Sequence, residues 1–304
     1  MTEITTTLGK SFLLAGVLPA VMVIILHDLL LVPWFPKTQH LYEMDFLGLK
    51  GGLYLVLSLF LALLLLTFNG FVVRWMTNGW PFTHWFIQYN RRRHAETHTA
   101  FLTRLADYQE AIKEEDSIES SQQKLEFVYE LLQKEASQLH FPVSMDYLRA
   151  TRLGNVFAVV SEYAYERYRM DISIYWSRLS AVIPPEYKSE IADAKTSFDF
   201  WLHLTVLILI FAVETLLLSW WLKDFLLLSY SVTTLVVAYG LYRVAVDMAY
   251  TMSVLIMNCF DLFRQDLLAQ LGILQPKELA VEQKLWLKLV LFIRYGERTD
   301  YPSG

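Results

Sequence analysis

The chain has 304 residues, of which 55% are hydrophobic and 19% charged, and its formal net charge is −5 at pH 7. A negative charge balance gives no electrostatic support to a general role in binding nucleic acid. The single cysteine, Cys259, excludes a disulfide framework within the chain. The apolar residues are concentrated in four long runs, a distribution typical of membrane proteins rather than of a large soluble core.

The four apolar runs predict four membrane-spanning helices, at about residues 11–34, 51–73, 200–222 and 226–244. Each run has about the 20 residues that cross a hydrocarbon core of about 30 Å. Only helices satisfy their own backbone in lipid without closing a barrel, so we expect an all-α polytopic membrane protein. The first run is too long for a signal-peptide core and lacks a small-residue cleavage pattern, so we expect it to be retained.

The runs pair into two transmembrane hairpins separated by a polar region. We expect a first hairpin over residues 1–75, a cytosolic helical domain over 76–199, a second hairpin over 200–248 and cytosolic helices over 249–304. Residues 74–199 carry 15 Lys and Arg residues and the part from Arg243 onward carries seven, whereas the loop between the first two runs has only Lys37 and Lys50. The positive-inside rule therefore predicts that both termini and the middle region are cytosolic.

Local signals predict where individual helices begin, bend and end. Pro19 removes a backbone donor from the first run and predicts a kink. Between the hairpins, hydrophobic periodicity predicts helices over about 85–115, 120–138, 155–168 and 172–182. From Glu186 the pattern continues without a breaker into the third span. The fourth span continues to about Leu271, where Gly272 ends it, and Pro276 starts a last helix.

Glu214 is an ionisable residue inside the third run. It lies about nine residues from the outer turn at Lys223, which is roughly 13 Å and close to the bilayer midplane. An antiparallel neighbour brings Thr233 and Thr234 to a similar depth. Intramembrane carboxylates usually face a bundle interior or water. One interpretation is an ion or proton path; the other is a protonated glutamic acid bonded to these hydroxyls or to a helix of another subunit.

Two more polar pairs lie near the predicted membrane interfaces. Arg243 and Asp247 share a helix face at the inner end of the fourth run. They form either an interfacial salt bridge, which we favour, or a charged gate or lipid head-group contact. His27 and Asp28 lie near the outer end of the first run and form either a pH-sensitive pair or a polar cap at head-group level.

His94 and His98 share one face of a predicted helix, a spacing that suits zinc. The order His-Ala-Glu-Thr-His is not the metalloprotease motif, however, and the Pro-Cys-x-x-Cys partner of the zinc deaminases is absent. The neighbouring run Arg91, Arg92 and Arg93 repels a cation and suits anionic lipid head groups of the inner leaflet. We therefore expect a solvated helix face here, no metal and no cofactor.

Several strings resemble an uncharacterised family of bacterial multi-span membrane proteins. They are Thr151–Asn155, Tyr163–Tyr168 with Asp171, Trp176–Leu179, Asn69-Gly70 with Arg74, and Asp261–Arg264 with Leu267-Leu268. The family form has proline where Ser177 stands and glycine where Arg169 stands, so this chain departs from it. The resemblance implies a bacterial inner-membrane protein with the hairpin–insert–hairpin layout, and it implies no chemistry.

Arginine and aromatic residues alternate within these strings. Such residues are enriched at protein interfaces and also stack in folded cores through cation–π contacts. Core packing and docking of a partner or another subunit both remain open for this group, which comprises Arg152, Tyr165, Arg167, Tyr168, Trp176 and Arg178.

No Walker loop, dinucleotide turn or nucleophile elbow occurs in the sequence, which makes an enzyme the weaker class. We expect a non-enzymatic, homo-oligomeric membrane scaffold or sensor that contacts membrane lipids and couples the inner membrane to a cytosolic protein. The alternative is a homo-oligomeric pore or ion-conducting effector that uses Glu214, Thr233 and Thr234. A third hypothesis is a membrane-embedded lipid-acting enzyme that uses His94, Glu96 and His98.

Overall fold

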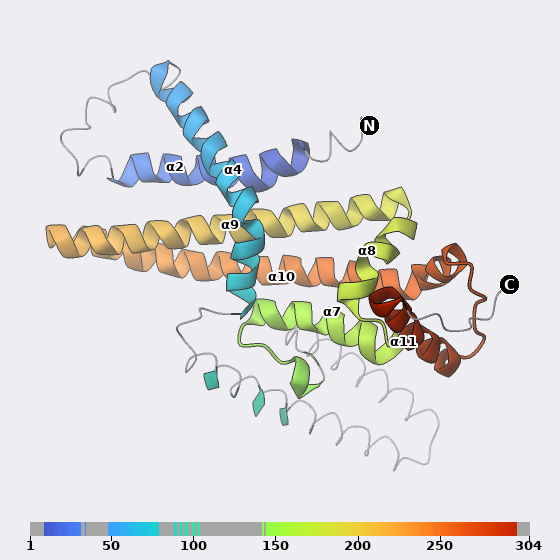
Figure 1. The fold of residues 1–304 in the computed structure, drawn as a ribbon. Helices are drawn as coiled ribbons and strands as arrows, with labels where there is room; N and C mark the ends of the chain where they lie inside the picture. The colour runs from blue at the N-terminus through green and yellow to red at the C-terminus, as the bar shows by residue number, and fades with distance from the viewer. Residues whose placement is uncertain are drawn as a thin grey trace, which may run out of the picture. The chain divides into compact units, whose positions relative to one another are not determined.

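The computed structural model describes residues 9–31, 34, 48–78, 88–89, 92, 95–96, 99–100, 103, 142 and 144–296. Its principal elements are a π-helical turn η1 (Phe12–Val17), a 3-10 turn η4 (Met145–Tyr147) and α2 (Leu18–Leu31), α4 (Leu49–Asn78), α7 (Arg152–Tyr168), α8 (Ile172–Val182), α9 (Pro185–Leu222), α10 (Phe225–Gln270) and α11 (Leu279–Tyr295) (Figure 1). The predicted all-α fold is confirmed.

Four helical segments are long and apolar enough to cross a membrane, and they contain the four predicted runs in large part. These segments are 9–31, 50–78, 185–222 and 225–270. The unbroken entry into the third span is confirmed, because α9 begins at Pro185. The last helix begins at Leu279, three residues after the predicted Pro276. The predicted helices 85–115 and 120–138 lie almost entirely outside the described residues.

Contacts within the chain divide it into two units. Unit 1 comprises residues 1–72 and 189–252, and unit 2 comprises 73–188 and 253–304. The helix α10 supplies residues to both units. The orientation of the chain across a bilayer and the predicted cytosolic boundaries remain predictions.

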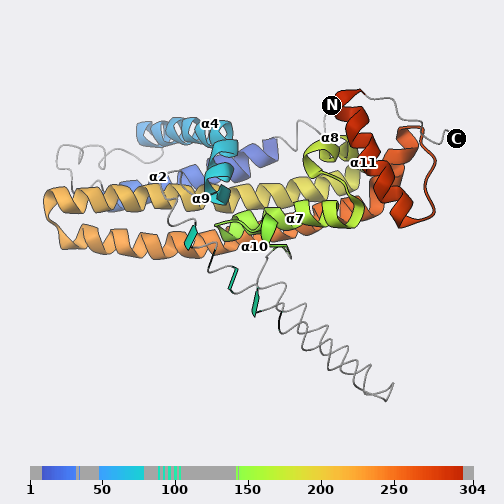
Figure 2. The same ribbon diagram turned by 60° about the horizontal axis from the view of Figure 1, so that its bottom comes forward.

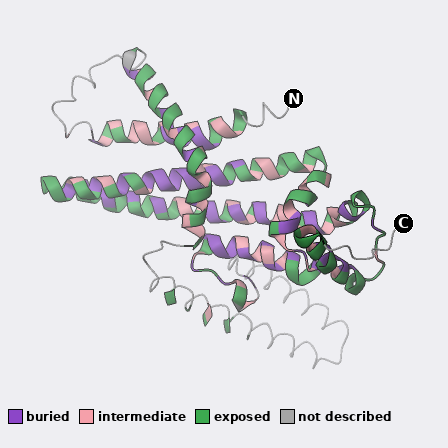
Figure 3. Cartoon of the chain, viewed as in Figure 1, coloured by how far each residue is buried: buried purple, intermediate pink, exposed green. Residues whose placement is uncertain are grey.

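In unit 1, α9 is the most buried span. Of its apolar window 61% is buried, against 22% in each of the other three spans (Figure 3 shows the buried positions along α9). It runs beside the first part of α10, and both views of the ribbon show the two helices side by side (Figures 1 and 2). Many large apolar side chains face outward, among them Val56, Phe71 and Val236. An apolar exterior of this kind is stable where lipid, not water, is the solvent.

Small residues allow two helices of unit 1 to approach closely. A Cβ built on Gly16 would lie 3.2 Å from the Cβ of Ala62 on α4. Ala20 and Ser58, one turn along each helix, are fully buried. Close approach of this kind is the usual way in which helices associate in lipid, where no hydrophobic drive acts between them.

Unit 2 is built around α7, α8, α11 and the last part of α10. The N-cap of α7 is Thr151, whose side chain accepts from the Gly154 N–H and donates to the Thr77 carbonyl, 2.7 Å away. Gly154 lies so close to Thr77 that an added Cβ would be 2.3 Å from that carbonyl oxygen. The C-cap of α7, Arg169, has φ 59°, a left-handed conformation that favours glycine.

Candidate functional site

A fully buried histidine joins three helices of unit 1. Pro19 has no N–H to donate to the carbonyl four residues back, that of Ala15. The Nδ1 of His203 on α9 lies 2.6 Å from this carbonyl oxygen and donates to it. The second ring nitrogen lies 3.3 Å from Oδ1 of Asn69 on α4. The predicted backbone defect at Pro19 is thus satisfied by a side chain from the third span.

Asn69 connects this histidine to a buried carboxylate. Its Nδ2 donates to Asp199 Oδ1 at 3.2 Å, and Lys195 pairs with the same carboxylate. Both nitrogens of His203 therefore face acceptor oxygens. An imidazolium donates to both acceptors, whereas a neutral imidazole donates to only one.

A second polar group of unit 1 lies where α2 ends and α4 begins. His27 Nε2 is 3.2 Å from Glu214 Oε1, and Lys50 Nζ is 2.8 Å from Asp28 Oδ2. Lys50 and Asp28 are largely buried, with 8% and 15% of their side chains exposed, whereas His27 and Glu214 are 46% and 42% exposed. The neighbours His27 and Asp28 therefore take different partners instead of acting as one pair.

The contact of Glu214 with His27 corrects one interpretation of the sequence, in which Glu214 bonds the hydroxyls of Thr233 and Thr234. The Thr234 hydroxyl donates to the Tyr230 carbonyl at 2.8 Å, and Thr233 is exposed. Threonine in a helix commonly bonds its own backbone in this way, which removes its hydroxyl as a donor to other groups. The structure pairs Glu214 with His27 instead.

Apolar residues separate the two polar groups along α9. His203 and Glu214 are 11 positions apart, roughly 16 Å along a helix. Between them Leu207 and Phe211 are buried, with exposed fractions of 4% and 1%. Within the described part of unit 1, these apolar side chains therefore separate His203 from Glu214 along α9.

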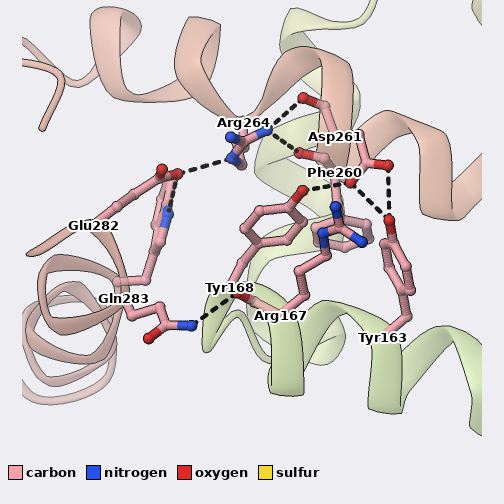
Figure 4. A network of polar contacts seen from close by, with 9 residues as sticks. Tyr163, Arg167, Tyr168, Phe260, Asp261, Arg264, Glu282 and Gln283 are labelled. Atoms are coloured by element: carbon pink, nitrogen blue, oxygen red, sulfur yellow. Dashed lines mark hydrogen bonds and ion pairs between the residues drawn. The ribbon is translucent and has the colours of Figure 1, made fainter. Parts of the chain in front are cut away.

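Unit 2 contains a polar network centred on Asp261 of α10 (Figure 4). The carboxylate accepts the hydroxyl of Tyr163 at 2.7 Å and that of Tyr168 at 2.5 Å, both from α7. Burial, followed by the hydrogen bond to Asp261, raises the pKa of both tyrosines above the ordinary value of 10. Asp261 therefore holds the two phenols in their neutral, donating form.

Arg264, one turn further along α10, extends the network to α11. Its guanidinium lies 4.4 Å from the ring centre of Tyr168, and its Nε donates to Glu282 Oε1 at 2.9 Å. Trp286 Nε1 donates to the same oxygen at 3.1 Å. The buried charge of Glu282 is thus matched by one cation and one neutral donor, as a buried carboxylate requires.

The arginine and aromatic residues predicted for docking separate into two sets. Tyr168 is buried in the network, and Arg167 stacks on the rings of Tyr163 and Tyr168 at 5.5 and 5.8 Å. These contacts favour the core-packing interpretation for Tyr168, whereas Arg167 is exposed and lies against the two rings. Exposed positions remain at Arg152, Tyr165 and Arg178, and Trp176 is partly buried.

The structure says less about the remaining predicted site residues. Arg243 and Asp247 are exposed one helical turn apart on α10, and their ion pair stays a prediction. Arg92 is exposed, whereas Arg91, Arg93, His94 and His98 lie outside the described residues. Among the residues that the structure does describe, no group of three His, Cys, Asp or Glu side chains is placed to hold a metal.

Sequence reasoning missed the partners in both units. The roles of Asp261, Arg264 and Glu282 depend on contacts between helices far apart in the chain. The one signal available was an acidic residue, Glu282, in a Lys-rich amphipathic helix one turn before a tryptophan. In unit 1, no pattern in the sequence analysis singled out His203.

Comparison of the chain with protein-family models, with curated proteins and with solved structures gives no match. Any functional proposal therefore depends on the two polar groups of unit 1 and the network of unit 2.

Proposed function

We propose that this chain is a non-enzymatic scaffold or sensor of the bacterial inner membrane, which assembles with further copies of itself and couples the bilayer to a cytosolic protein. The observation that carries the proposal is the length and composition of α10. Its 46 residues span roughly 70 Å at 1.5 Å per residue, more than twice a hydrocarbon core of about 30 Å. The same helix holds apolar residues of unit 1 and the network residues Asp261 and Arg264 of unit 2.

This helix gives the coupling a physical route. Asp261 and Arg264 bind side chains of α7 and α11, so a change in α10 changes the partners of Tyr163, Tyr168 and Glu282. The distribution of Lys and Arg supports a cytosolic position for unit 2. Its exposed arginine and tyrosine side chains are of the types enriched at protein interfaces.

Native mass spectrometry of the chain, extracted gently from its host membrane, tests the proposal. We expect masses of a homo-oligomer or of a complex with a second protein. Arg152→Glu and Tyr165→Ala change exposed residues of α7 outside the Asp261 network, and we expect each to lower the fraction of assembled chain. Lys188→Ala, an exposed change on α9, serves as the matched control. A monomer without any retained protein contradicts the proposal.

One observation favours the ion-conducting alternative: the pair His27 and Glu214 inside the spans. Leu207 and Phe211 interrupt the polar groups of α9, so a path would have to form between copies of the chain. Ion flux into liposomes that contain the chain, reduced by Glu214→Gln and unaffected by Glu190→Gln, supports this alternative. Flux equal to that of empty liposomes contradicts it.

A further inference from the structure

Unit 1 contains a partly open cavity of about 930 Å³, lined by α2, the first half of α4 and the second half of α9. Small-molecule sites usually occupy about 300–1,000 Å³, so this cavity has room for a ligand. Most of its lining is apolar, and the polar side chains on it are His27, Asp28, Lys50, Tyr54 and Glu214.

The polar and apolar parts of the lining are separated along the helices. On α4 the lining extends from Lys50, near the start of the helix, to Leu61, which is roughly 16 Å deeper at 1.5 Å per residue. That depth is about half of a hydrocarbon core of about 30 Å, or one leaflet. Lys50 and Tyr54 line the beginning of this path, and Leu57 and Leu61 line its end. The cavity thus has the polarity profile of a lipid that lies in one leaflet.

The charges of the cavity favour a cationic head group. Lys50 is buried against Asp28 at 2.8 Å, so these two charges compensate each other. Glu214 adds a second negative charge, and its neighbour His27 adds no positive charge when its ring is neutral. Glu214 is also 42% exposed. An incompletely compensated carboxylate that faces a mainly apolar cavity is costly, and a cation next to it lowers that cost.

We infer that this cavity binds one bilayer phospholipid with a protonated amine in its head group, the ammonium contacting Glu214 and an acyl chain lying along Leu57 and Leu61. A primary ammonium supplies a further positive charge at the polar end and donates hydrogen bonds to the carboxylate. The inference concerns unit 1 alone. It goes beyond the proposed function and does not depend on a cytosolic partner.

The test reconstitutes the full chain into vesicles of phosphatidylethanolamine and phosphatidylglycerol and counts the lipids retained by each chain in native mass spectrometry. We expect the ratio of retained phosphatidylethanolamine to retained phosphatidylglycerol to be about ten times their ratio in the vesicle, because hydrogen bonds to charged groups contribute at least a decade of affinity. Glu214→Gln should abolish the enrichment, and Glu190→Gln, on an exposed part of α9, should preserve it. Equal retention of both lipids by the wild type, or unchanged enrichment in Glu214→Gln, overturns the inference.

A second pair of variants tests the apolar end without altering a charge. Leu57→Trp narrows the apolar end of the cavity and should reduce lipid retention, whereas Leu55→Trp changes an exposed leucine of the same helix that does not line it. Retention by Leu57→Trp equal to that of Leu55→Trp contradicts the inference. Soluble phosphoethanolamine should not displace the lipid, because it lacks the acyl chain; displacement would show that the head group alone is bound.

Discussion

Both units contain charged and polar side chains that pair across helices, but the contacts are arranged in different ways. In unit 1, Lys50 pairs with Asp28 and His27 with Glu214, and a separate chain of contacts joins His203, Asn69 and Asp199. In unit 2, Asp261, Arg264 and Glu282 form one network with neutral donors from α7 and α11. The polar contacts of unit 1 are therefore divided among separate groups, whereas those of unit 2 join three helices in one network.

If lipid surrounds unit 1 and water surrounds unit 2, as we propose, the solvent explains part of this difference. In lipid, helices gain nothing hydrophobic from packing together, so small residues and polar contacts would hold unit 1. In unit 2 a buried core holds the helices together. There Tyr175 packs edge-on against Trp286, with ring centres 5.1 Å apart. The network then fixes how the helices of unit 2 meet. We therefore expect single substitutions to destabilise unit 2 more than unit 1.

The largest effect is expected from Gly154→Val in unit 2. The new side chain would begin 2.3 Å from the Thr77 carbonyl oxygen, a backbone atom that also accepts the Thr151 hydroxyl. Because backbone cannot rotate away, we expect a loss of more than about 3 kcal/mol in the free energy of unfolding. Thermal unfolding of the full chain in detergent micelles measures it.

A helical glycine of unit 1 provides the control. Gly240 on α10 has open space around its Cα, so Gly240→Ala should be neutral or stabilise by about 0.5 kcal/mol. Similar losses in the two variants would contradict the close approach at Gly154 and remove this part of the contrast between the units.

Next in size is Asp261→Ala, which removes the acceptor of two phenols at once. We expect a loss of about 2 kcal/mol, since each hydrogen bond to a charged group contributes about 1.5–3 kcal/mol and the freed hydroxyls regain part of it from water. Thermal unfolding again measures the change. A loss no greater than that of Ser177→Ala, an exposed change on α8, would contradict the network.

The same network predicts a weakening at alkaline pH. The pKa values of Tyr163 and Tyr168 are raised in the folded chain, so folding is favoured fully below the unfolded value of about 10. As the pH rises above 10, the unfolded chain loses these protons first and unit 2 loses stability. Tyr163→Phe should make this decline shallower, and Tyr165→Phe, at an exposed position, should not.

A smaller effect is expected from His203→Leu in unit 1. The substitution leaves the Ala15 carbonyl without its donor, and Pro19 supplies none. Because hydrogen bonds between membrane helices contribute only about 0.6–2 kcal/mol, we expect a loss of about 1 kcal/mol. Adding Pro19→Ala supplies an N–H four residues after Ala15 and should recover part of it. No recovery in the double variant would contradict the role of His203 at this carbonyl.

The elements that could be predicted from the sequence are those whose signals are local. The length of the apolar runs predicted the four candidate spans, and the unbroken pattern after Glu186 predicted that α9 begins near this residue. The predicted helix 172–182 matches α8 residue for residue. Start signals were less reliable: proline suits the first helical turn, yet α11 begins after Pro276 because Glu278 is its N-cap.

Partners across the fold could not be predicted, because they depend on which helices meet. The sequence identified Glu214 as costly inside a membrane and suggested the nearby threonines as its partners, but the Thr234 hydroxyl bonds its own helix. It left core packing and docking both open for Arg167 and Tyr168. Only the contact with α10 shows that these two side chains belong to the Asp261 network.

The smallest effect, and the one that best isolates backbone from side-chain energy, is expected at Arg169. Its φ of 59° costs a non-glycine residue about 1–2 kcal/mol. The arginine offsets part of this through an exposed ion pair with Glu166 and a stack on Tyr165. Arg169→Gly and Arg169→Ala lose the same contacts, but only glycine relieves the backbone. We therefore expect the glycine variant to be the more stable of the two by about 1 kcal/mol in thermal unfolding, and within about 0.5 kcal/mol of the wild type. Equal stabilities would mean that the end of α7 rearranges when the arginine is removed.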